Sequence, residues 1–491
     1  VWIAFNIGGD QFTWISSLHL AVALASQAVL LAATVESIAR NQQGNDSLSP
    51  DAGFRRLAVL TLAAVLILII SGSLIAPAEA LESCKGWPLC GPELIPGDAG
   101  GWLQLSHRLI VAGAGILMLV LFIQAWRTQR TKTLILVAAT SAVVLFFAQA
   151  LLGSKLVAGY PLYMLVLHQS TAAAIWGVLV ILVSYMKITY SAQAEISPEA
   201  ILLRKRTGLV KDLLMLTKPI VVALLLVTTY TGMVIGAQEW PDGRILFWTL
   251  LSGFLAAGGS GAINQYIDRE DDSKMQRTQK RPIPSGRLTP AEGLAAGVAM
   301  TLTSFYLMVA FVNWLAALLT LAGIIYYVLI YSIFLKKTTV QNIVIGGGAG
   351  AIPPLVGWAA ATGSLNIPSL FLFAVVFTWT PPHFWALALV RQNDYARAGV
   401  PMLPVIRGAL ETRWQILIYT IELVVLTLLL PAFGLGGAIY LVGAFVLGMW
   451  LLGAAWKVWK QGGNKLAWKM YRYSSMYLAF LFLILMVDRL L

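Results

Sequence analysis

The 491 residues carry a formal net charge of +12, yet 58% of them are hydrophobic and only 11% are charged. With a mean hydropathy of +0.78, this composition excludes a soluble globular protein. A basic excess is typical of membrane proteins that face anionic lipid. Since no aromatic and basic platform accompanies it, we expect no nucleic-acid partner.

Apolar runs of roughly 17–25 residues recur along the chain, which is the length of a helix that crosses a bilayer. They do not alternate between apolar and polar residues as barrel strands do. The sequence therefore predicts an all-α polytopic membrane protein with about fourteen transmembrane helices, five in a first region and nine in a second. The expected spans are 14–36, 57–76, 103–125, 133–152, 164–187, 218–236, 246–266, 290–310, 316–334, 342–360, 368–390, 413–433, 437–456 and 474–491.

Basic residues gather in alternate loops between these spans. The loops near 40–56, 127–132 and 204–206 are rich in Arg and Lys, whereas 77–102 and 153–163 contain one lysine each. By the positive-inside rule, the basic loops face the cytoplasm. We therefore expect a multi-pass protein of the cell (inner) membrane.

Three of the four histidines lie in apolar helices of the first region. His19, His107 and His168 each fall about five residues inside the expected outer end of a span, roughly 8 Å deep at 1.5 Å per residue. Ionisable residues inside a membrane are rare and suggest function. For any one of them a hydrogen-bonded structural role is an equal alternative. His107 and His168 together favour bis-imidazole ligation of a haem near the outer face.

The cysteines Cys84 and Cys90 share one expected outer loop, Cys-Lys-Gly-Trp-Pro-Leu-Cys. The environment outside the membrane favours disulfides, and a spacer that contains Gly86 and Pro88 can close such a ring. Two thiols alone make a poor metal site. We therefore predict a disulfide, either structural or redox-active.

A weak internal repeat places Leu-His near the outer start of an Ala-rich helix at Leu18-His19 and again at Leu167-His168. If His168 pairs with His107 two helices earlier, His19 needs a similar partner before residue 1. The pattern therefore predicts further helices upstream, so that the first region is an N-terminally truncated domain.

With these residues, region 1–190 resembles the C-terminal part of the heme A synthase family, membrane enzymes that oxidise a methyl group of haem O. That family has two four-helix halves, each with a histidine pair, and an outer loop with two cysteines. The resemblance implies that Cys84, Cys90, His107 and His168 belong to the half that binds haem b. It also implies that His19 is a haem ligand of the half where substrate haem lies.

The composition changes over residues 191–211, which contain Pro198 and the run Arg204-Lys205-Arg206. We predict a cytoplasmic linker there, between a domain at 1–190 and a second domain at 212–491.

The second region has its most informative stretch at the end of its second span, where Asn264, Asp268 and Asp272 follow one another at four-residue steps. That spacing places the three side chains on one helical face. Stacked carboxylates repel unless a cation lies between them, and oxygen ligands favour a hard ion such as Mg²⁺. The sequence therefore predicts a Mg²⁺ site, and the alternative is a solvated, charged loop.

Basic residues follow at Arg277 and Arg281, and the next inner loop adds Lys336 and Lys337. Arg and Lys beside a metal site are the groups that a diphosphate leaving group needs. We expect these four residues to bind substrate at a cytoplasmic mouth, although Lys336 and Lys337 also fit ordinary positive-inside flanking.

His383 lies in a later span, directly after Pro381-Pro382, and Asp394 follows near its inner end. Two prolines cannot both continue helical hydrogen bonding, so we expect the helix to break there and to line a cavity. An intramembrane histidine beside such a break is a candidate substrate-binding residue, and we expect the same of Asp394.

These stretches belong to a longer series of motifs in order along 212–491. The series is Asn264-x₃-Asp268-x₃-Asp272, Met275-x-Arg277-Thr278-x₂-Arg281-Pro282, Tyr331-Ser332-x₃-Lys336-Lys337-x-Thr339, Gly346-Gly347-x₂-Gly350-Ala351-x-Pro353-Pro354, Thr380-Pro381-Pro382-His383-Phe384-Trp385 and Asp394-Tyr395-x₃-Gly399-x-Pro401. With these motifs the region closely resembles the heme O synthase (protoheme IX farnesyltransferase) family, a branch of the UbiA-type intramembrane prenyltransferases.

The resemblance implies transfer of a farnesyl group from farnesyl diphosphate to a vinyl group of haem b, with Asn264, Asp268 and Asp272 as catalytic Mg²⁺ ligands. Most of the wider superfamily has a second Asp-x₃-Asp motif, where this chain offers His383 and Asp394 as the haem-modifying branch does. The fused first region then implies oxidation of haem O to haem A, with haem b as its cofactor. Membrane lipid and terminal oxidase assembly components are the further partners implied.

Two other functions are compatible with parts of the sequence. One is a UbiA-type prenyltransferase with a quinone or chlorin acceptor. The other is a non-enzymatic haem-binding protein of electron transfer or transport, which would use His107 and His168. The acidic cluster with its Arg-rich loop argues against the second as a full account of the chain.

Overall fold

The computed structural model divides the chain into two compact units, Val1–Thr207 and Gly208–Leu491. Within the described residues, fourteen helices are long and apolar enough to cross a membrane, and no strand occurs. The predicted fold class, an all-α polytopic membrane protein, is therefore confirmed. The structure describes residues 13–41, 52–75, 84, 86–90, 96–159, 161–191 and 208–491.

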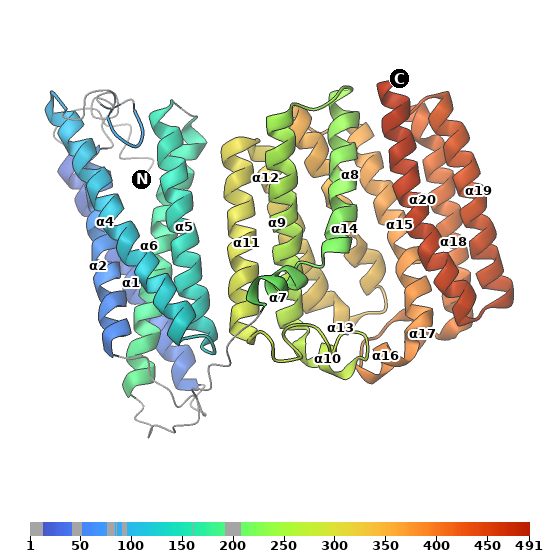
Figure 1. Cartoon of the computed structure of the whole chain (residues 1–491), viewed down its shortest axis with the longest axis horizontal. Coiled ribbons are helices and arrows are strands. Elements are labelled where there is room, and N and C mark those ends of the chain that lie inside the picture. Colours follow the sequence, from blue (N-terminus) through green and yellow to red (C-terminus); the bar gives the residue numbers. More distant parts are fainter. Residues whose placement is uncertain are drawn as a thin grey trace. The chain divides into compact units, whose positions relative to one another are not determined.

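The described part of the first unit is a bundle of five long helices (Figure 1). The helix α5 packs between α4 and α6, while α2 contacts both α4 and α6, and α1 packs on α6. The predicted linker falls mostly outside the described residues. The bounds of the helices are α1 (Thr13–Asn41), α2 (Ala52–Ile75), α4 (Ala99–Thr128), α5 (Thr133–Val157) and α6 (Leu162–Ser191).

The second unit contains nine spans and several short helices that connect them. Its last span, α20, packs on its first, α8, so that the helices surround a common interior. The bounds are α7 (Leu209–Leu216), α8 (Pro219–Ala237), α9 (Gly243–Ile267), α10 (Arg269–Lys274), α11 (Pro290–Phe311), α12 (Trp314–Ile325), η4 (Tyr326–Leu335), α13 (Lys336–Thr338), α14 (Asn342–Thr362), α15 (Ile367–Val390), α16 (Gln392–Arg397), α17 (Leu403–Ile406), α18 (Gly408–Leu429), η5 (Leu430–Phe433), α19 (Ala438–Gln461) and α20 (Asn464–Leu490).

The two ends of this second bundle differ. The short helices α10, α13, α16 and α17 gather at one end, and the C-terminus of the chain lies at the other (Figure 1). The helix α8 runs from one end to the other, and its backbone packs closely against that of α14 at glycines. A Cβ on Gly357 would lie 1.8 Å from the Thr229 carbonyl oxygen, and one on Gly232 would lie 2.2 Å from that of Pro354. Only glycine allows the two backbones to approach so closely.

The predicted helix break at Pro381-Pro382 is wrong, because α15 continues as one helix from Ile367 to Val390. The φ angle of a proline is compatible with an α-helix, and a proline weakens the helix because its backbone has no N–H donor. Threonine hydroxyls on the same helix donate to carbonyls of the preceding turn, from Thr378 to Ala374 at 2.9 Å and from Thr380 to Val376 at 2.8 Å. The carbonyls left without an amide donor are those of Phe377 and Thr378, so the continuous helix depends instead on the neighbours α14, α18 and α20 that pack on it.

Candidate active site

The acidic cluster is held at the junction of two helices. Asp242 caps the start of α9 by accepting hydrogen bonds from the amides of Arg244 and Ile245. At the other end, α9 stops at Ile267 and α10 starts at Arg269, with Asp268 between them. The four-residue hydrogen-bond pattern persists across this junction, from Asp268 to the Asn264 carbonyl and from Asp272 to that of Asp268. The predicted common face is therefore kept, although the helix is interrupted.

Each carboxylate of the cluster is held by a cation. Lys336 Nζ lies 2.5 Å from Asp268 Oδ2, and an Arg281 guanidinium nitrogen lies 2.6 Å from Asp272 Oδ2. The neighbouring Asp271 pairs with Lys337 at 2.8 Å. Asp268 and Asp272 are each only 3% exposed, so these charges are stable only because they are paired. The structure thus brings together the predicted acidic and basic residues around one network.

Lys218 is a member of this network that sequence reasoning missed. It precedes Pro219 at the start of α8 and has a φ of 54°, which non-glycine residues rarely adopt. Its Nζ donates to Asn264 Oδ1 at 2.8 Å. Burial, with Arg281 and Lys336 close by, lowers the pKa of Lys218 to about 7. The only sequence signal was a lysine directly before the proline of a span, which reads as ordinary flanking.

The amide of Asn264 links the lysine to the acids. Its Nδ2 donates to Asp268 Oδ2 at 2.9 Å and to Ser332 Oγ at 3.0 Å. Ser332 lies on the π-helix η4, in which backbone bonds span five residues, as from the Lys336 amide to the Tyr331 carbonyl. Wide turns of this kind occur often at functional sites. This turn presents Ser332 and Lys336 to the cluster.

The cluster fits a divalent cation that a substrate helps to bind. Asp268 Oδ1 is buried and has no hydrogen-bond partner among the described residues, so one oxygen of the site is free for a ligand. In those residues no three His, Cys, Asp or Glu side chains gather as a metal site, so the protein offers two carboxylates and the Asn264 amide. Mg²⁺ commonly takes one or two carboxylates together with substrate phosphates.

Two further predicted residues lie on the same end of the unit. Arg277 is exposed. Burial raises the pKa of Tyr395, and the positive charges of Arg277 and Arg281 offset part of that rise. Asp394 is buried and forms an ion pair with Arg397. Their roles in substrate binding stay predictions.

His383 lies on α15 and is 6% exposed. Its ring stacks on Trp379, with 4.3 Å between centroids, and lies 4.5 Å from that of Tyr471. Its Nδ1 is 2.8 Å from Ser474 Oγ, and Ser474 donates its own proton to the Tyr471 carbonyl at 2.9 Å. Because the serine has a single proton, His383 must donate from Nδ1, which leaves a lone pair on Nε2. His383 is therefore set up as an acceptor or a metal ligand.

The first unit holds His107 in the same way. His107 Nδ1 lies 2.8 Å from Ser71 Oγ, and Ser71 donates to the Leu68 carbonyl at 2.8 Å. His107 Nε2 therefore also carries a free lone pair. A Cβ on Gly72 would lie 3.2 Å from His107 Cε1, and one on Gly153 would lie 3.3 Å from that of His168. Each imidazole edge is thus matched with a glycine of a neighbouring helix.

His107 and His168 are both half-buried, and each lies within electrostatic reach of the other. The Nδ1–H of His107 and the glycines beside both imidazoles fit paired axial ligands, which need bare Nε2 atoms, although His168 Nδ1 has no hydrogen-bond partner among the described residues. His19, the third predicted ligand, is exposed on α1. The haem itself and the three ligand roles stay predictions.

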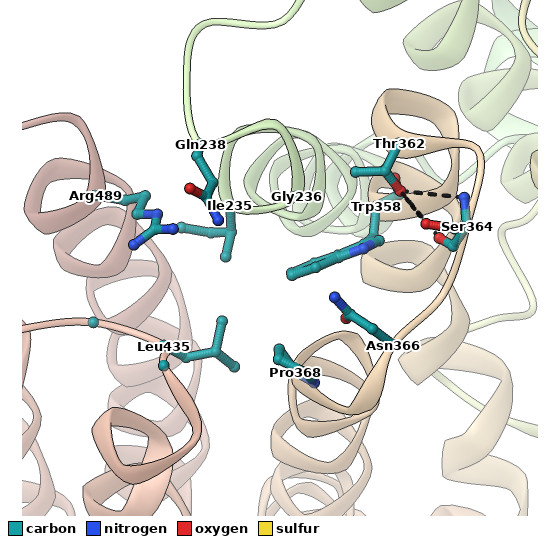
Figure 2. Close-up of a pocket in the computed structure, with 12 residues that line it drawn as sticks. Ile235, Gly236, Gln238, Trp358, Thr362, Ser364, Asn366, Pro368, Leu435 and Arg489 are labelled. Atoms are coloured by element: carbon teal, nitrogen blue, oxygen red, sulfur yellow. Dashed lines mark hydrogen bonds between the residues drawn. The ribbon is translucent and has the colours of Figure 1, made fainter.

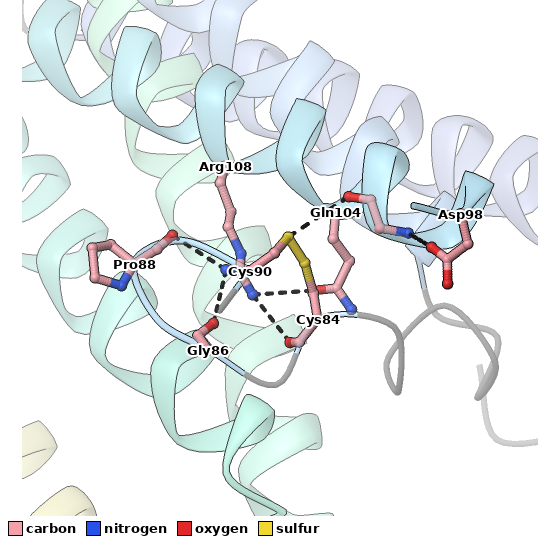
Figure 3. The surroundings of a disulfide bond; sticks show 8 residues. Cys84, Gly86, Pro88, Cys90, Asp98, Gln104 and Arg108 are labelled. Carbon is pink, nitrogen blue, oxygen red and sulfur yellow. Dashed lines mark hydrogen bonds between the residues drawn. A yellow bond between two sulfur atoms is a disulfide. The ribbon is translucent and has the colours of Figure 1, made fainter. Parts of the chain in front are cut away.

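The structure joins Cys84 and Cys90, the two cysteines of the predicted disulfide, and their Cα atoms are 4.5 Å apart. Figure 3 shows that Arg108 extends into the loop that this bond closes. Arg108 donates to the Gly86 carbonyl at 2.8 Å and to the Pro88 carbonyl at 3.2 Å. Because Arg108 follows His107 on α4, the disulfide loop is tied to the helix turn that carries the histidine.

Both units are similar to known proteins. Residues 225–483 match the model of the UbiA prenyltransferase family, and residues 7–180 match that of a cytochrome oxidase assembly protein. A curated relative from Roseiflexus sp. (strain RS-1), named protoheme IX farnesyltransferase, is 44% identical over 88% of this chain and 84% of its own. The same-named protein of Roseiflexus castenholzii is 43% identical, over 88% of this chain and 83% of its own.

A solved UbiA homologue from Archaeoglobus fulgidus, bound to GPP and Mg²⁺, aligns with 16% identity and a TM-score of 0.44 over 56% of this chain and 99% of its own. The sequence matches are far stronger than this one, and they extend over most of both chains for the Roseiflexus proteins. They confirm both resemblances that the motifs predicted. The chain is a member of the UbiA prenyltransferase family, with a region like the cytochrome oxidase assembly proteins ahead of the prenyltransferase unit.

Proposed function

We propose that the second unit transfers the farnesyl group of farnesyl diphosphate to a vinyl group of haem b and so forms haem O. The observation that carries the proposal is the buried network in which Lys218, Arg281 and Lys336 surround Asp268 and Asp272. The curated relatives over most of the chain are named protoheme IX farnesyltransferase, which supports this choice of substrates.

The network can exchange its partners when substrate binds. Asn264, Asp268 and Asp272 would hold Mg²⁺, which supplies positive charge to the diphosphate oxygens. Lys336 and Arg281, now paired with the carboxylates, would then turn to those oxygens and stabilise the charge that develops as the diphosphate leaves. Because both cations already lie at the cluster, this change of partners is complete once substrate has bound, before the diphosphate leaves.

The allylic fragment develops positive charge as its bond to the diphosphate oxygen breaks. Tyr327 and Tyr331 stack with 5.6 Å between their centroids, and Tyr327 OH lies 3.5 Å from Lys218 Nζ. Aromatic faces stabilise a nearby cation. The vinyl group then forms the new carbon–carbon bond, and water adds to the resulting porphyrin cation with release of a proton.

His383 supports haem b as the acceptor. Its Nε2 lone pair can bind the iron or accept a hydrogen bond from a protonated propionic acid of the haem. The rings of Trp379 and Tyr471 fix the plane of the His383 imidazole. We propose that His383 orients the haem rather than taking part in bond formation.

For the first unit, we propose that His107 and His168 ligate one haem b and that the unit oxidises haem O to haem A. The serine-held tautomer of His107 and the two glycines beside the imidazoles support the ligation. We also propose that the acidic cluster faces the cytoplasm, as the basic loops indicate.

The test is product identification with purified full chain in lipid nanodiscs, supplied with haem b, farnesyl diphosphate and Mg²⁺. Mass spectrometry of extracted porphyrins should find the mass of haem O. Asp268→Asn should lower its formation by about 10²–10³-fold, since it removes a charged group that the transition state needs. Asp242→Asn is the matched control, because asparagine also caps a helix and this site lies at the far end of α9.

Three outcomes contradict the proposal. One is a prenylated quinone or chlorin, but no haem O, when these acceptors are offered together with haem b. A second is normal turnover in Asp268→Asn, which removes the acidic cluster from the reaction. The third is equal loss in Asp242→Asn, which assigns the effect to folding.

A further inference from the structure

The second unit contains a cavity at the end opposite to the acidic cluster. Figure 2 shows Arg489, Gln238, Trp358 and Asn366 around it. The cavity has a volume of about 140 Å³, room for more than a single water molecule. The helix α8 connects the two sites, since Lys218 precedes its first residue and Gln238 follows its last, so they are about 28 Å apart along its 19 residues.

Hydrogen-bond donors predominate on the cavity wall. Arg489 is half-buried, and its guanidinium group makes no ion pair or hydrogen bond with the part of the chain that the structure describes. Trp358 is 5% exposed, and its indole N–H has no acceptor among the same residues. A buried donor without a partner costs about 1–3 kcal/mol, so a ligand that accepts from it is favoured.

Two acceptors beside the cavity are already in use. Asn366 Oδ1 caps α15 by accepting from the Ser369 amide at 3.1 Å, which leaves its NH₂ group available. Asp488, the neighbour of Arg489 in sequence, accepts instead from the amides of Gly437 and Tyr440 at the start of α19. No acidic side chain lines the cavity. Apart from the amide of Gln238, its vacant side-chain groups are therefore one cation and neutral donors, and this set favours an anion rich in oxygen acceptors.

Apolar residues complete the wall, namely Ile235, Leu435 and Pro368. The spans α8, α14 and α20 end at the cavity, and α15 and α19 begin there. The cavity therefore lies at the level where a bilayer passes from hydrocarbon to headgroups. A basic residue in the last turn of α20 also suits the helix dipole, but this does not account for the unpartnered Trp358.

We propose that this cavity is a second binding site, which takes a phosphate group. Arg489 binds its oxygens, and the indole of Trp358 and the amide of Asn366 donate to it. The chemistry is shared by the headgroup of an anionic phospholipid and by free phosphate. The apolar wall and the bilayer level favour the lipid. The site is separate from the acidic cluster and does not depend on the proposed function.

The experiment is native mass spectrometry of the detergent-purified full chain with phosphatidylglycerol, with diacylglycerol as the lipid that lacks phosphate. Arg489→Gln should weaken phosphatidylglycerol binding by about tenfold or more, which is the value of a charge-assisted hydrogen bond. Asn366→Asp keeps the helix cap but places a carboxylate in the cavity, and should weaken it similarly. Arg472→Gln, an exposed arginine on the same helix, is the matched control.

A second arm titrates inorganic phosphate and records thermal stability of the same proteins. Competition between phosphate and phosphatidylglycerol, lost in Arg489→Gln and Asn366→Asp, supports the site and shows that the phosphate group is what it recognises. Stabilisation by phosphate without specific lipid binding supports a site for the free anion. Equal binding in wild type and both cavity variants, or equal binding of diacylglycerol, overturns the proposal.

Discussion

In both units a serine orients a histidine through the same pair of hydrogen bonds, but the residues around the two imidazoles differ. His107 and His383 each donate from Nδ1 to a serine, and each serine donates to a carbonyl three residues earlier on its own helix. Beside His107 lies Gly72, which leaves the imidazole edge open, whereas His383 is stacked between Trp379 and Tyr471. The tautomer is thus set locally by a serine, and the neighbours decide what can reach the free nitrogen.

Charge is the second difference between the units. The second unit has a buried network of ion pairs at Asp268 and Asp272. In the first unit, the cation next to His107 is Arg108, which is turned to the disulfide loop. We therefore expect variants to separate the two activities, with effects that decrease from the ligands to their supporting residues.

The largest effect is expected from His107→Ala, which removes one proposed axial ligand. The optical spectrum of a low-spin bis-histidine haem should disappear from the purified protein, because one imidazole cannot maintain six-coordinate iron. Formation of haem O should stay at the wild-type rate. Loss of both in a correctly inserted protein would contradict the separation of the units.

Lys218→Gln should impair the second unit alone. The change leaves Asn264 without its charged partner and removes one cation from the network, so the KM for farnesyl diphosphate should rise by about tenfold or more. Lys211→Gln on α7 is the control for charge, because Lys211 is exposed. An unchanged KM would place Lys218 outside the substrate site.

Ser71→Ala tests the histidine–serine hydrogen bond in the first unit. Without the serine, His107 Nδ1 loses its acceptor, and haem affinity should fall by about 10–100-fold, as for other residues that orient metal ligands. Haem titration followed by absorbance measures this. Ser71→Thr keeps the hydroxyl and should restore binding, whereas failure of both variants would indicate a packing role.

Ser474→Ala tests the histidine–serine hydrogen bond in the second unit, where aromatic contacts also hold the imidazole of His383. Because Trp379 and Tyr471 still fix the plane of His383, the rate of haem O formation should fall by only about tenfold. The Soret band of bound haem b should shift if Nε2 binds iron. Ser474→Thr should recover both, and an unshifted band would assign His383 to hydrogen bonding.

The smallest effect is expected from Gly72→Ala. Its new Cβ would lie 3.2 Å from His107 Cε1, so the imidazole must move by a few tenths of an ångström. Haem should still bind, with a few-fold lower affinity and a changed electron paramagnetic resonance spectrum. A spectrum identical to that of the wild type would show that the ring already has room to move.

The fold was readable from the sequence because span length and apolar composition are local properties. The break expected at Pro381-Pro382 failed because a proline has a helical φ, and packing of α15 on α14, α18 and α20 holds the helix in spite of two missing donors. The acidic cluster was also readable, since Asn264, Asp268 and Asp272 lie at helical spacing on adjacent turns.

Long-range partners were not readable. Ser474 is 91 residues from His383 and looks like one more small residue in an apolar helix. Lys218 is 46 residues from Asn264 and precedes a proline at a membrane boundary, where basic residues are common. Single-sequence patterns report periodicity, whereas these contacts depend on which helices become neighbours.

The π-helix η4 makes the length of its segment matter more than its composition. A wide turn holds one residue more than an α-helical turn, and each residue of an α-helix turns the chain by about 100°. One residue more in this segment would turn everything after it by about that angle and move Lys336 away from Asp268, whereas deleting one residue would convert the wide turn into an α-helical turn and leave the lysine in register. Substitutions here can drift over evolutionary time, but an insertion would displace the lysine in one step.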